Sequence, residues 1–221
     1  MPWRDAAPAI LFELMPGQES GNSIAATILG RNNPAGRLPV SFPASMTDTW
    51  LGNPVNPAQY PGTDRGKGFP ESDYTEGLLM GYRWYDSQQA APLWPFGHGM
   101  SYTAFNYSSI VVAGAVSATT SATVYATVCW AGGPPGAEVA QLYVAHPAAA
   151  GEPPRQLKGF ARVELVDDPA SCAGLAFPLA AEDLAVWDAG AQAWSLVPGE
   201  YTAHVGASSR DLRLTATFTV A

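Results

Sequence analysis

Three carboxylates crowd a short polar stretch in the first half of the chain. Glu71, Asp73 and Glu76 lie in "PESDYTEG", and carboxyl groups held close together can act as general acid and general base. Such residues could shape the rim of an active site, but solvated acids are the commoner finding in a polar loop. We therefore assign the three residues no catalytic role, and we predict no acid–base pair in this chain.

A histidine between two glycines is the second candidate for chemistry. His98 stands in "PFGHGMSYTAF" (residues 95–105), and a general base there would need a partner group and a substrate within reach. The flanking glycines allow positive φ and close backbone approach, and Pro95 fixes a bend. The pattern favours a turn that joins two domains, with His98 hydrogen-bonded in it. Aromatic side chains would anchor the domains against each other, namely Phe96, Tyr102 and Phe105.

Glu19 and Arg83 carry charges in suggestive places, and both are interpreted as structural. Glu19 follows "PGQ" at a predicted helix start, where a carboxylate interacts favourably with the helix dipole whether or not it does chemistry. Arg83 lies in "GYRWYD", where its guanidinium can stack on an aromatic ring or pair with Asp86 or Glu76. A structural ion pair is expected rather than a contact with substrate.

The remaining chemical side chains predict no metal site and no cofactor. His146 and His204 have no Cys, His or acidic residue at metal-ligand spacing, and neither a phosphate-binding loop nor a nucleophile elbow is present. Asp183 and Asp188 suit turn and cap positions. The tryptophans could include a sugar-stacking face, but most are expected in a core or an interface. They are Trp50, Trp84, Trp94, Trp130, Trp187 and Trp194.

Charge and hydropathy argue against two classes of partner. The net charge is −8, with 11 Lys and Arg against 19 Asp and Glu, so no basic stripe follows a phosphate backbone. No apolar run approaches the roughly 20 residues that span a bilayer, and no basic region precedes the first apolar stretch as a secretory signal requires. We predict no nucleic-acid and no membrane partner. Cys129 and Cys172 could pair, and Asn106-Tyr107-Ser108 would accept a glycan in a secreted protein or occur by chance.

The first 43 residues have an alternating α and β pattern. "APAILFEL" (residues 7–14) is an apolar run of strand length that predicts a buried parallel strand. "PGQESGNSIAATILG" (residues 16–30) predicts one helix with Ile24, Ile28 and Leu29 on one face. A turn and a short edge strand follow in residues 33–43. One such β-α-β unit cannot bury both faces of its sheet, so we expect the chain to begin inside an α/β domain.

The rest of the chain changes character twice. Residues 44–98 are rich in Pro, Gly, Asn and aromatics, with little periodicity, and predict a wrapping connector. From about Ala104, seven alternating runs separated by turns predict an immunoglobulin-like or fibronectin type III-like β-sandwich. The expected fold is therefore mainly β with a partial α/β segment. Its divisions are 1–43 (the end of an α/β sandwich domain), 44–98 (the connector) and 99–221 (the β-sandwich).

Motifs along nearly the whole chain resemble the C-terminal part of family 3 glycoside hydrolases, the family of β-glucosidases and β-xylosidases. They occur in the order of that family and include "MPWRD", "PGQESGNSIAATILG", "NPAGRLPVSFP", "YTEGLLMGYRWYD", "PLWPFGHGMSYTAFNYS", "GAEVAQLYV" and "RQLKGFARVEL". Two sandwich turns, at 129–132 and 166–169, depart from the usual pattern. The resemblance implies an α/β sandwich domain that ends near residue 98, followed by a fibronectin type III-like domain.

The resemblance also implies where catalysis takes place. Family members are retaining glycosidases whose nucleophile is an aspartate in a Ser-Asp-Trp context, and that tripeptide does not occur here. Their acid/base glutamate lies upstream of the "PGQE" helix. We therefore predict no catalytic and no substrate-binding residue in this chain, and expect its partner to be the remainder of a parent hydrolase. A β-glycoside substrate would be reached only through the intact enzyme.

Two other interpretations remain open from the sequence. The sandwich could be a stand-alone module that binds a glycan or a protein, because a fold does not imply a function. Alternatively, the chain could be a subunit that docks on a separately encoded barrel. The first 43 residues argue against a free module, because it would expose a half-finished apolar sheet edge.

Overall fold

Seven long strands follow residue 103, one for each alternating run in the sequence, which confirms that prediction. The structure is a computed structural model that describes residues 3–45, 47–50, 52 and 56–221; the first two residues of "MPWRD" lie outside it. The long strands are β3 (Ala104–Gly114), β4 (Ala122–Gly132), β5 (Gly136–Ala145), β6 (Gln156–Leu165), β7 (Cys172–Leu179), β10 (Gly199–Gly206) and β11 (Leu212–Val220).

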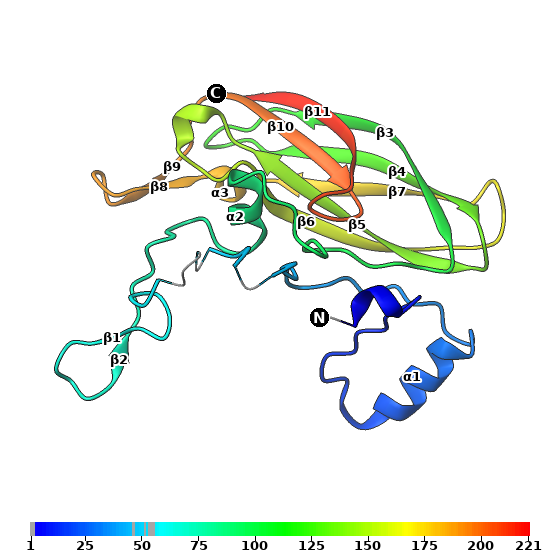
Figure 1. The fold of residues 1–221 in the computed structure, drawn as a ribbon. Coiled ribbons are helices and arrows are strands. Elements are labelled where there is room, and N and C mark those ends of the chain that lie inside the picture. The colour runs from blue at the N-terminus through cyan, green and yellow to red at the C-terminus, as the bar shows by residue number, and fades with distance from the viewer. Residues whose placement is uncertain (1–2, 46, 51, 53–55) are drawn as a thin grey trace.

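Two antiparallel sheets pack face to face to form the sandwich (Figure 1). One sheet has the order β11-β10-β5-β6 and the other the order β3-β4-β7. Alternate residues of a strand point to opposite faces, so in β4 Val124, Ala126 and Val128 are buried while Tyr125 is half exposed. Both sheets contribute to one core, which includes Leu142, Phe177 and Tyr201. The fold is mainly β, as the sequence predicts.

Strand β5 differs from its neighbours because both of its faces are covered. Ala140, Leu142 and Val144 point into the core, and the polar Gln141 and Tyr143 on the opposite face are also buried. The covering side comes from the N-terminal part of the chain, which contacts the four-stranded sheet. The alternation of the run "EVAQLYVAH" suggests that its polar residues face solvent. In the structure Glu138, Gln141 and Tyr143 are buried instead.

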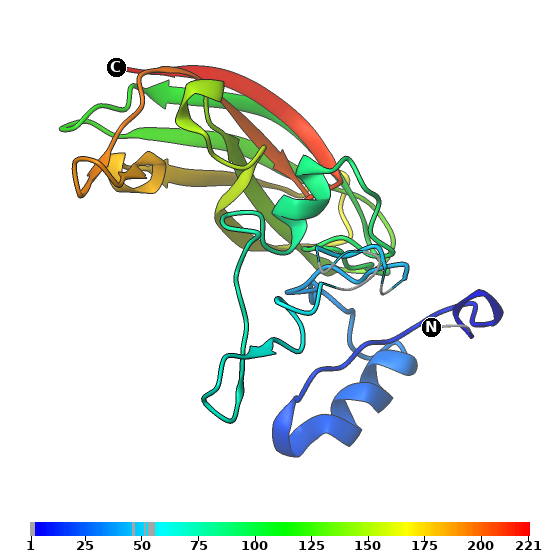
Figure 2. The same ribbon diagram turned by 60° about the vertical axis from the view of Figure 1, so that its left-hand side comes forward.

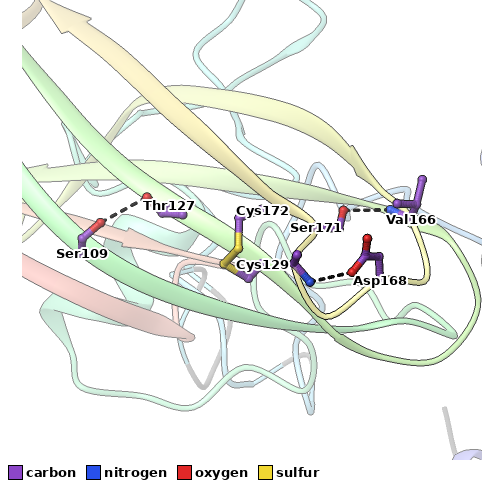
Figure 3. The surroundings of a disulfide bond; sticks show 8 residues. Ser109, Thr127, Cys129, Val166, Asp168, Ser171 and Cys172 are labelled. Atoms are coloured by element: carbon purple, nitrogen blue, oxygen red, sulfur yellow. Dashed lines mark hydrogen bonds between the residues drawn. A yellow bond between two sulfur atoms is a disulfide. The ribbon is translucent and has the colours of Figure 1, made fainter.

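A disulfide joins the two cysteines, a pairing that the sequence left open. Cys129 of β4 and Cys172 of β7 lie directly opposite each other in the strand register. Figure 3 shows the bond between these two strands. It therefore cross-links two neighbouring strands of the three-stranded sheet.

Short elements fill the connection between β7 and β10. A one-turn helix, α3 (Ala181–Leu184), is followed by a hairpin of β8 (Val186–Asp188) and β9 (Ala193–Ser195). The Asp183 carboxylate accepts a hydrogen bond from the Ala180 backbone N–H (2.8 Å). Asp188 accepts bonds from two backbone N–H groups of the hairpin turn. The cap and turn roles predicted for these two aspartates are confirmed.

The N-terminal segment contains the predicted helix but not the predicted strands. Two 3₁₀ turns, η1 (Arg4–Ala6) and η2 (Gly17–Glu19), precede helix α1 (Ser20–Ile28). The strand predicted for residues 7–14 is wrong: the segment pairs with no other strand, and Leu11, Phe12 and Leu14 are 49–63% exposed. Apolar character alone does not make a strand, because the backbone must also find a hydrogen-bonding neighbour. The strand expected in residues 33–43 is reduced to one bridge, between Phe42 and Trp94.

The connector predicted for residues 44–98 has three short regular elements in its described part. Strands β1 (Thr63–Asp64) and β2 (Pro70–Glu71) form a small hairpin, and helix α2 (Tyr82–Ser87) follows. In Figures 1 and 2 the hairpin extends away from the sandwich, and α1 stands apart from both sheets. No helix in the described ranges has the length and apolar character needed to cross a membrane.

Candidate functional site

The turn at residues 95–99 joins the N-terminal segments to the sandwich. Leu38 and the turn exchange two backbone hydrogen bonds of 2.8 Å, one to the His98 carbonyl and one from the Gly97 N–H. The Phe96 carbonyl accepts a bond from the Ser209 N–H in the β10–β11 loop (3.0 Å). His98 is thus hydrogen-bonded in the turn through its backbone. Burial, followed by the charge of Arg37, lowers the pKa of its imidazole.

Close backbone approach explains why glycines flank His98. A Cβ atom on Gly97 would strike the side chain of Gln141, and one on Gly99 would strike the Gly36 carbonyl. Gln141 of β5 donates its amide hydrogens to the carbonyls of Gly97 (3.1 Å) and Ala207 (2.7 Å). Its own oxygen accepts a bond from the Tyr143 hydroxyl (2.6 Å). This buried amide therefore connects the turn to two parts of the sandwich.

Asn33 forms a second connection, at the other end of the same contact. Its amide donates to the Thr103 hydroxyl (2.7 Å) and to the Pro135 carbonyl (2.9 Å). Its oxygen accepts bonds from the Ser101 hydroxyl (2.9 Å) and the Tyr102 N–H (3.0 Å). One side chain thus fixes both the start of β3 and the β4–β5 turn.

A buried ion pair lies between these two connections. Arg37 and Glu138 of β5 are 2.8 Å apart (Nη2 to Oε1), and their side chains are only 8% and 4% exposed. Glu138 also accepts a bond from the Val139 N–H (2.9 Å). Its charge contributes, after burial, to a raised pKa of the neighbouring Tyr107 hydroxyl. Arg37 supplies the positive charge that a buried carboxylate requires.

Asp86 of α2 forms a second charged connection, and it corrects one prediction. Its carboxylate is 1% exposed and lies 2.9 Å from Arg210 and 3.0 Å from Arg155. Of the two contacts predicted for Arg83, the ion pair with Asp86 or Glu76 is wrong, whereas stacking on an aromatic ring is confirmed. Arg83 instead lies over the Tyr82 ring, 5.9 Å from its centroid, because Asp86 faces the sandwich, which supplies nearer arginines.

Aromatic side chains complete the junction. Tyr82 stacks on Phe96 at 4.9 Å and meets Tyr143 edge-on at 5.8 Å, and its hydroxyl accepts a bond from the Leu157 N–H (2.8 Å). Tyr102 donates its hydroxyl to the Thr27 carbonyl at the end of α1 (2.9 Å). Phe96 and Tyr102 therefore act as predicted, whereas Phe105 packs against the sandwich core.

The acidic residues of the β1–β2 region are engaged with neighbours in the same region. Glu71 pairs with Lys67 and approaches Arg65 at 4.0 Å, and Arg65 also contacts Asp73. Glu76 accepts a bond from Gln59 (3.3 Å). At the start of α1, the exposed Glu19 accepts a bond from Asn22 (2.6 Å). These contacts support the structural interpretation of the four acids.

Some of the tryptophans pack inside the structure and others lie on its surface. Trp94 packs on Phe42, and Trp130 packs against the core and donates its indole N–H to the Gly133 carbonyl. Trp187 and Trp194 form an exposed pair on the β8–β9 hairpin, 5.6 Å apart. No group of three or more His, Cys, Asp or Glu suited to a metal is found in the part of the chain that the structure describes.

A broad apolar surface on the N-terminal segment is uncovered. Its side chains come from residues 10–15 and from the end of α1, and Met15 is 99% exposed. Ile28 and Leu29, two of the three residues predicted for the apolar helix face, are 68% and 62% exposed. Several large apolar side chains exposed within one segment of the chain are a candidate interaction surface. The full set is Ile10, Leu11, Phe12, Leu14, Met15, Ile28 and Leu29.

Sequence reasoning missed the polar residues that connect the two parts of the junction. Asn33 and Arg37 lie in "NPAGRLPVSFP", and Glu138 and Gln141 lie in "GAEVAQLYV", but these motifs indicate no role for them. The available signal was a Glu and a Gln inside the otherwise apolar run "GAEVAQLYV", since buried polar groups need partners.

Comparison with known families divides the chain in two. A model described as the glycosyl hydrolase family 3 C-terminal domain matches residues 1–102. A model described as a fibronectin type III-like domain matches residues 138–209. The uncovered apolar surface lies in the first of these ranges, and the strand β5 with its junction residues begins the second.

Individual relatives are similar over nearly the whole chain. A probable beta-glucosidase L from Aspergillus terreus is 38% identical over 96% of this chain, which spans 29% of that protein. The structure of DesR, a beta-glucosidase from Streptomyces venezuelae in complex with D-glucose, aligns over 100% of this chain and 27% of its own, with a TM-score of 0.88 and 33% identity. A beta-glucosidase structure from Bifidobacterium adolescentis covers 99% and 31%, with a TM-score of 0.87 and 35% identity.

Proposed function

The chain belongs to glycosyl hydrolase family 3, as its C-terminal part, and from this premise we propose that it serves a retaining β-glucosidase-like hydrolase in a structural role. It completes an α/β sandwich domain with residues 1–43 and holds that domain against the fibronectin type III-like sandwich. Hydrolysis of the O-glycosyl bond takes place on carboxylates outside this chain. Its partner is the remainder of the parent hydrolase.

The uncovered apolar surface is the observation that carries this proposal. Leu14 and Met15 are 63% and 99% exposed, and burying such side chains fully is worth roughly 1.5–3 kcal/mol each. Residues 7–14 pair with no strand in the described part of the chain. A neighbouring sheet and helices of the parent would supply both the hydrogen bonds and the cover.

The junction supports the bracing role. Arg37, Asp86 and Asn33 each join the N-terminal segments to the sandwich through buried or multiple polar contacts. Buried polar groups with satisfied partners fix one arrangement of the elements that carry them. Through these contacts the sandwich fixes the orientation of residues 33–43 and α2 relative to the parent domain.

The contacts of the acids support the assignment of catalysis to other parts of the parent. A retaining glycosidase uses two carboxyl groups about 5–5.5 Å apart, one as nucleophile and one as acid and base. Glu71 and Asp73 are instead in contact with Lys67 and Arg65 of the same hairpin region. Glu138 and Asp86 are buried against arginines.

An activity measurement on the chain and on the parent tests the proposal. The chain alone is expected to release no aglycone from an aryl β-glucoside, whereas co-expression with the preceding portion of the parent restores turnover. In the reconstituted pair, Leu14→Asp is expected to weaken association, because it places a charge in the apolar contact. Val111→Asp is the matched control, since Val111 is similarly exposed (56%) on the sandwich.

Two outcomes would overturn the proposal. One is turnover by the chain alone that a single Asp or Glu substitution within it abolishes. The other is equal association of the Leu14→Asp and Val111→Asp chains with the preceding portion. Tight binding of the chain to a barrel made from a separate gene would instead identify a docking subunit.

A further inference from the structure

Residues 106–108 form the only Asn-x-Ser/Thr sequence of the chain, and the structure presents it on an accessible surface. The sequence lies in β3, with a buried Tyr107 (7% exposed) between the exposed Asn106 and Ser108. Alternation along the strand therefore turns the amide and the hydroxyl outward together. An N-glycan acceptor needs this combination of residue types at a surface position.

The local backbone leaves room for a large substituent. β3 is the edge strand of its sheet, and a β-bulge follows between Ser108 and Ile110, with Ser109 at a φ of 52°. The outward neighbours across the sheet are small: Ser108 lies opposite Thr127, which lies opposite Gly174. Bulges of this kind interrupt the regular ladder of an edge strand, and this one directly follows the sequon.

The disulfide is an independent observation that points to the same chemistry. Asn106 lies opposite Cys129 in the register of β3 and β4, and Cys129 is bonded to Cys172 on the next strand. Cys172 is exposed and Cys129 is partly exposed, so the bond is on the outward face of the sheet. Accessible disulfides persist in oxidising compartments and are rare where glutathione keeps thiols reduced.

We propose that Asn106 is an N-glycosylation site and that the chain folds in an oxidising secretory compartment. In the reaction, the Asn106 side-chain nitrogen forms a bond to C1 of an oligosaccharide carried as a lipid-linked diphosphate. The bond between C1 and the diphosphate oxygen breaks, the diphosphate leaves with the electron pair, and the amide nitrogen loses one proton. The product has a glycan on the edge strand, one strand away from the disulfide.

Mass spectrometry on the protein purified from the cells that make it tests this proposal. A protease digest is treated with peptide N-glycosidase in heavy-oxygen water, and the peptide that contains Asn106 is analysed. The expected result is conversion of Asn106 to an Asp that contains the heavy oxygen. In parallel, alkylation of the unfolded but unreduced protein is expected to leave Cys129 and Cys172 unlabelled.

Variants separate the sequon from the fold. Ser108→Ala is expected to abolish the modification, whereas Ser108→Thr retains it, and Ser109→Ala, just outside the sequon, retains it as the matched control. Recovery of the Asn106 peptide with an unmodified amide and no glycosylated form would overturn the proposal. Labelling of both cysteines before reduction would overturn the assignment to an oxidising compartment.

Discussion

Arg37 and Glu138 are 101 residues apart in the sequence, and their side chains meet at 2.8 Å with less than a tenth of either surface exposed. The pair joins the loop after α1 to the central strand β5. A charge buried to this extent is tolerated only with its partner in place. The pair therefore makes the position of the N-terminal segment depend on the sandwich.

Removal of Arg37 is expected to destabilise the chain strongly. Arg37→Met leaves Glu138 buried without a counter-charge, and the free energy of unfolding should fall by about 3–5 kcal/mol. Urea denaturation measures this change. Arg162→Ala is the control, because its pair with Glu164 is more than half exposed and should contribute less than about 1 kcal/mol. A double change of Arg37 and Glu138 to Met should recover much of the loss. Equal losses of unfolding free energy for Arg37→Met, Arg162→Ala and the double variant would contradict the ion-pair explanation.

Asp86 is expected to matter far more than its sequence neighbour Arg83. Asp86→Asn removes the negative charge that faces Arg155 and Arg210, and two arginines then repel each other across a partly buried site. We expect earlier exchange of the α2 amide hydrogens and a clear loss of thermal stability. Arg83→Ala removes only a distant stacking contact and should change little. The reverse ranking would show that Arg83, and not Asp86, holds α2.

Gly99→Ala is expected to loosen the junction. The added methyl group would clash with the Gly36 carbonyl, and overpacking of this kind typically costs about 1–3 kcal/mol. Gly174→Ala, on the outward face of β7, meets no atom within 4 Å and should be nearly neutral. Denaturant unfolding of the two variants in parallel measures the difference. Equal stability would mean that the backbone segments at Gly36 and Gly99 separate without cost.

Acid is expected to destabilise the sandwich through His146. Burial, followed by the charge of Lys158, lowers the pKa of the imidazole in the folded chain, whereas the unfolded chain takes up its proton near the ordinary value of about 6.5. The unfolded state therefore binds more protons as the pH falls below that value, and stability declines. His146→Phe should reduce the slope of unfolding free energy against pH in this window. At a pH about 1.5 units above that ordinary value the imidazole of residue 146 is neutral in both the folded and the unfolded chain, so a measurement there isolates the effect of the substitution on packing. An unchanged slope would exclude His146 as the cause.

We propose that the chain divides between residues 98 and 99, and fragments test this division. Residues 99–221 contain all the strands of both large sheets and should unfold cooperatively on heating. The described part of residues 1–98 contains the short β1–β2 hairpin, helices α1 and α2, and an uncovered apolar surface, and this fragment should show no cooperative transition. Differential scanning calorimetry distinguishes the two cases, and a sharp transition in the shorter fragment would misplace the boundary.

The elements that could be predicted from the sequence are those whose own residues show a clear periodic pattern, whether or not their partners are close along the chain. The seven sandwich strands show period-2 alternation between turn residues, and helix α1 shows the helical period followed by Gly30. The run at residues 7–14 has the composition of a buried strand, but composition does not determine whether a segment finds a hydrogen-bonding partner and cover. The prediction that these residues form a buried strand is therefore wrong, because it rested on composition alone.

The junction residues could not be assigned for a related reason. Nothing near Arg37 in the sequence indicates a carboxylate in β5, and Arg83 is closer to Asp86 in sequence than either of the arginines that pair with it. Sequence proximity favoured the wrong ion pair because the helix turns Asp86 toward the sandwich. The roles of Phe96 and Tyr102 were accessible, since large aromatics beside a Pro-Gly turn have few positions other than an interface.

The two-sided burial of β5 has a consequence for exchanging domains between family members. Its inward residues fit the other sheet, while Gln141 and Tyr143 fit a turn and a helix outside the sandwich. A sandwich transplanted from a relative would bring its own core intact but would need a carboxylate at position 138 and an amide at position 141 to match Arg37 and Gly97. Compatibility of a chimera is thus decided by a few side chains on one strand, and those positions are the ones to match first when recombinant hybrids are built.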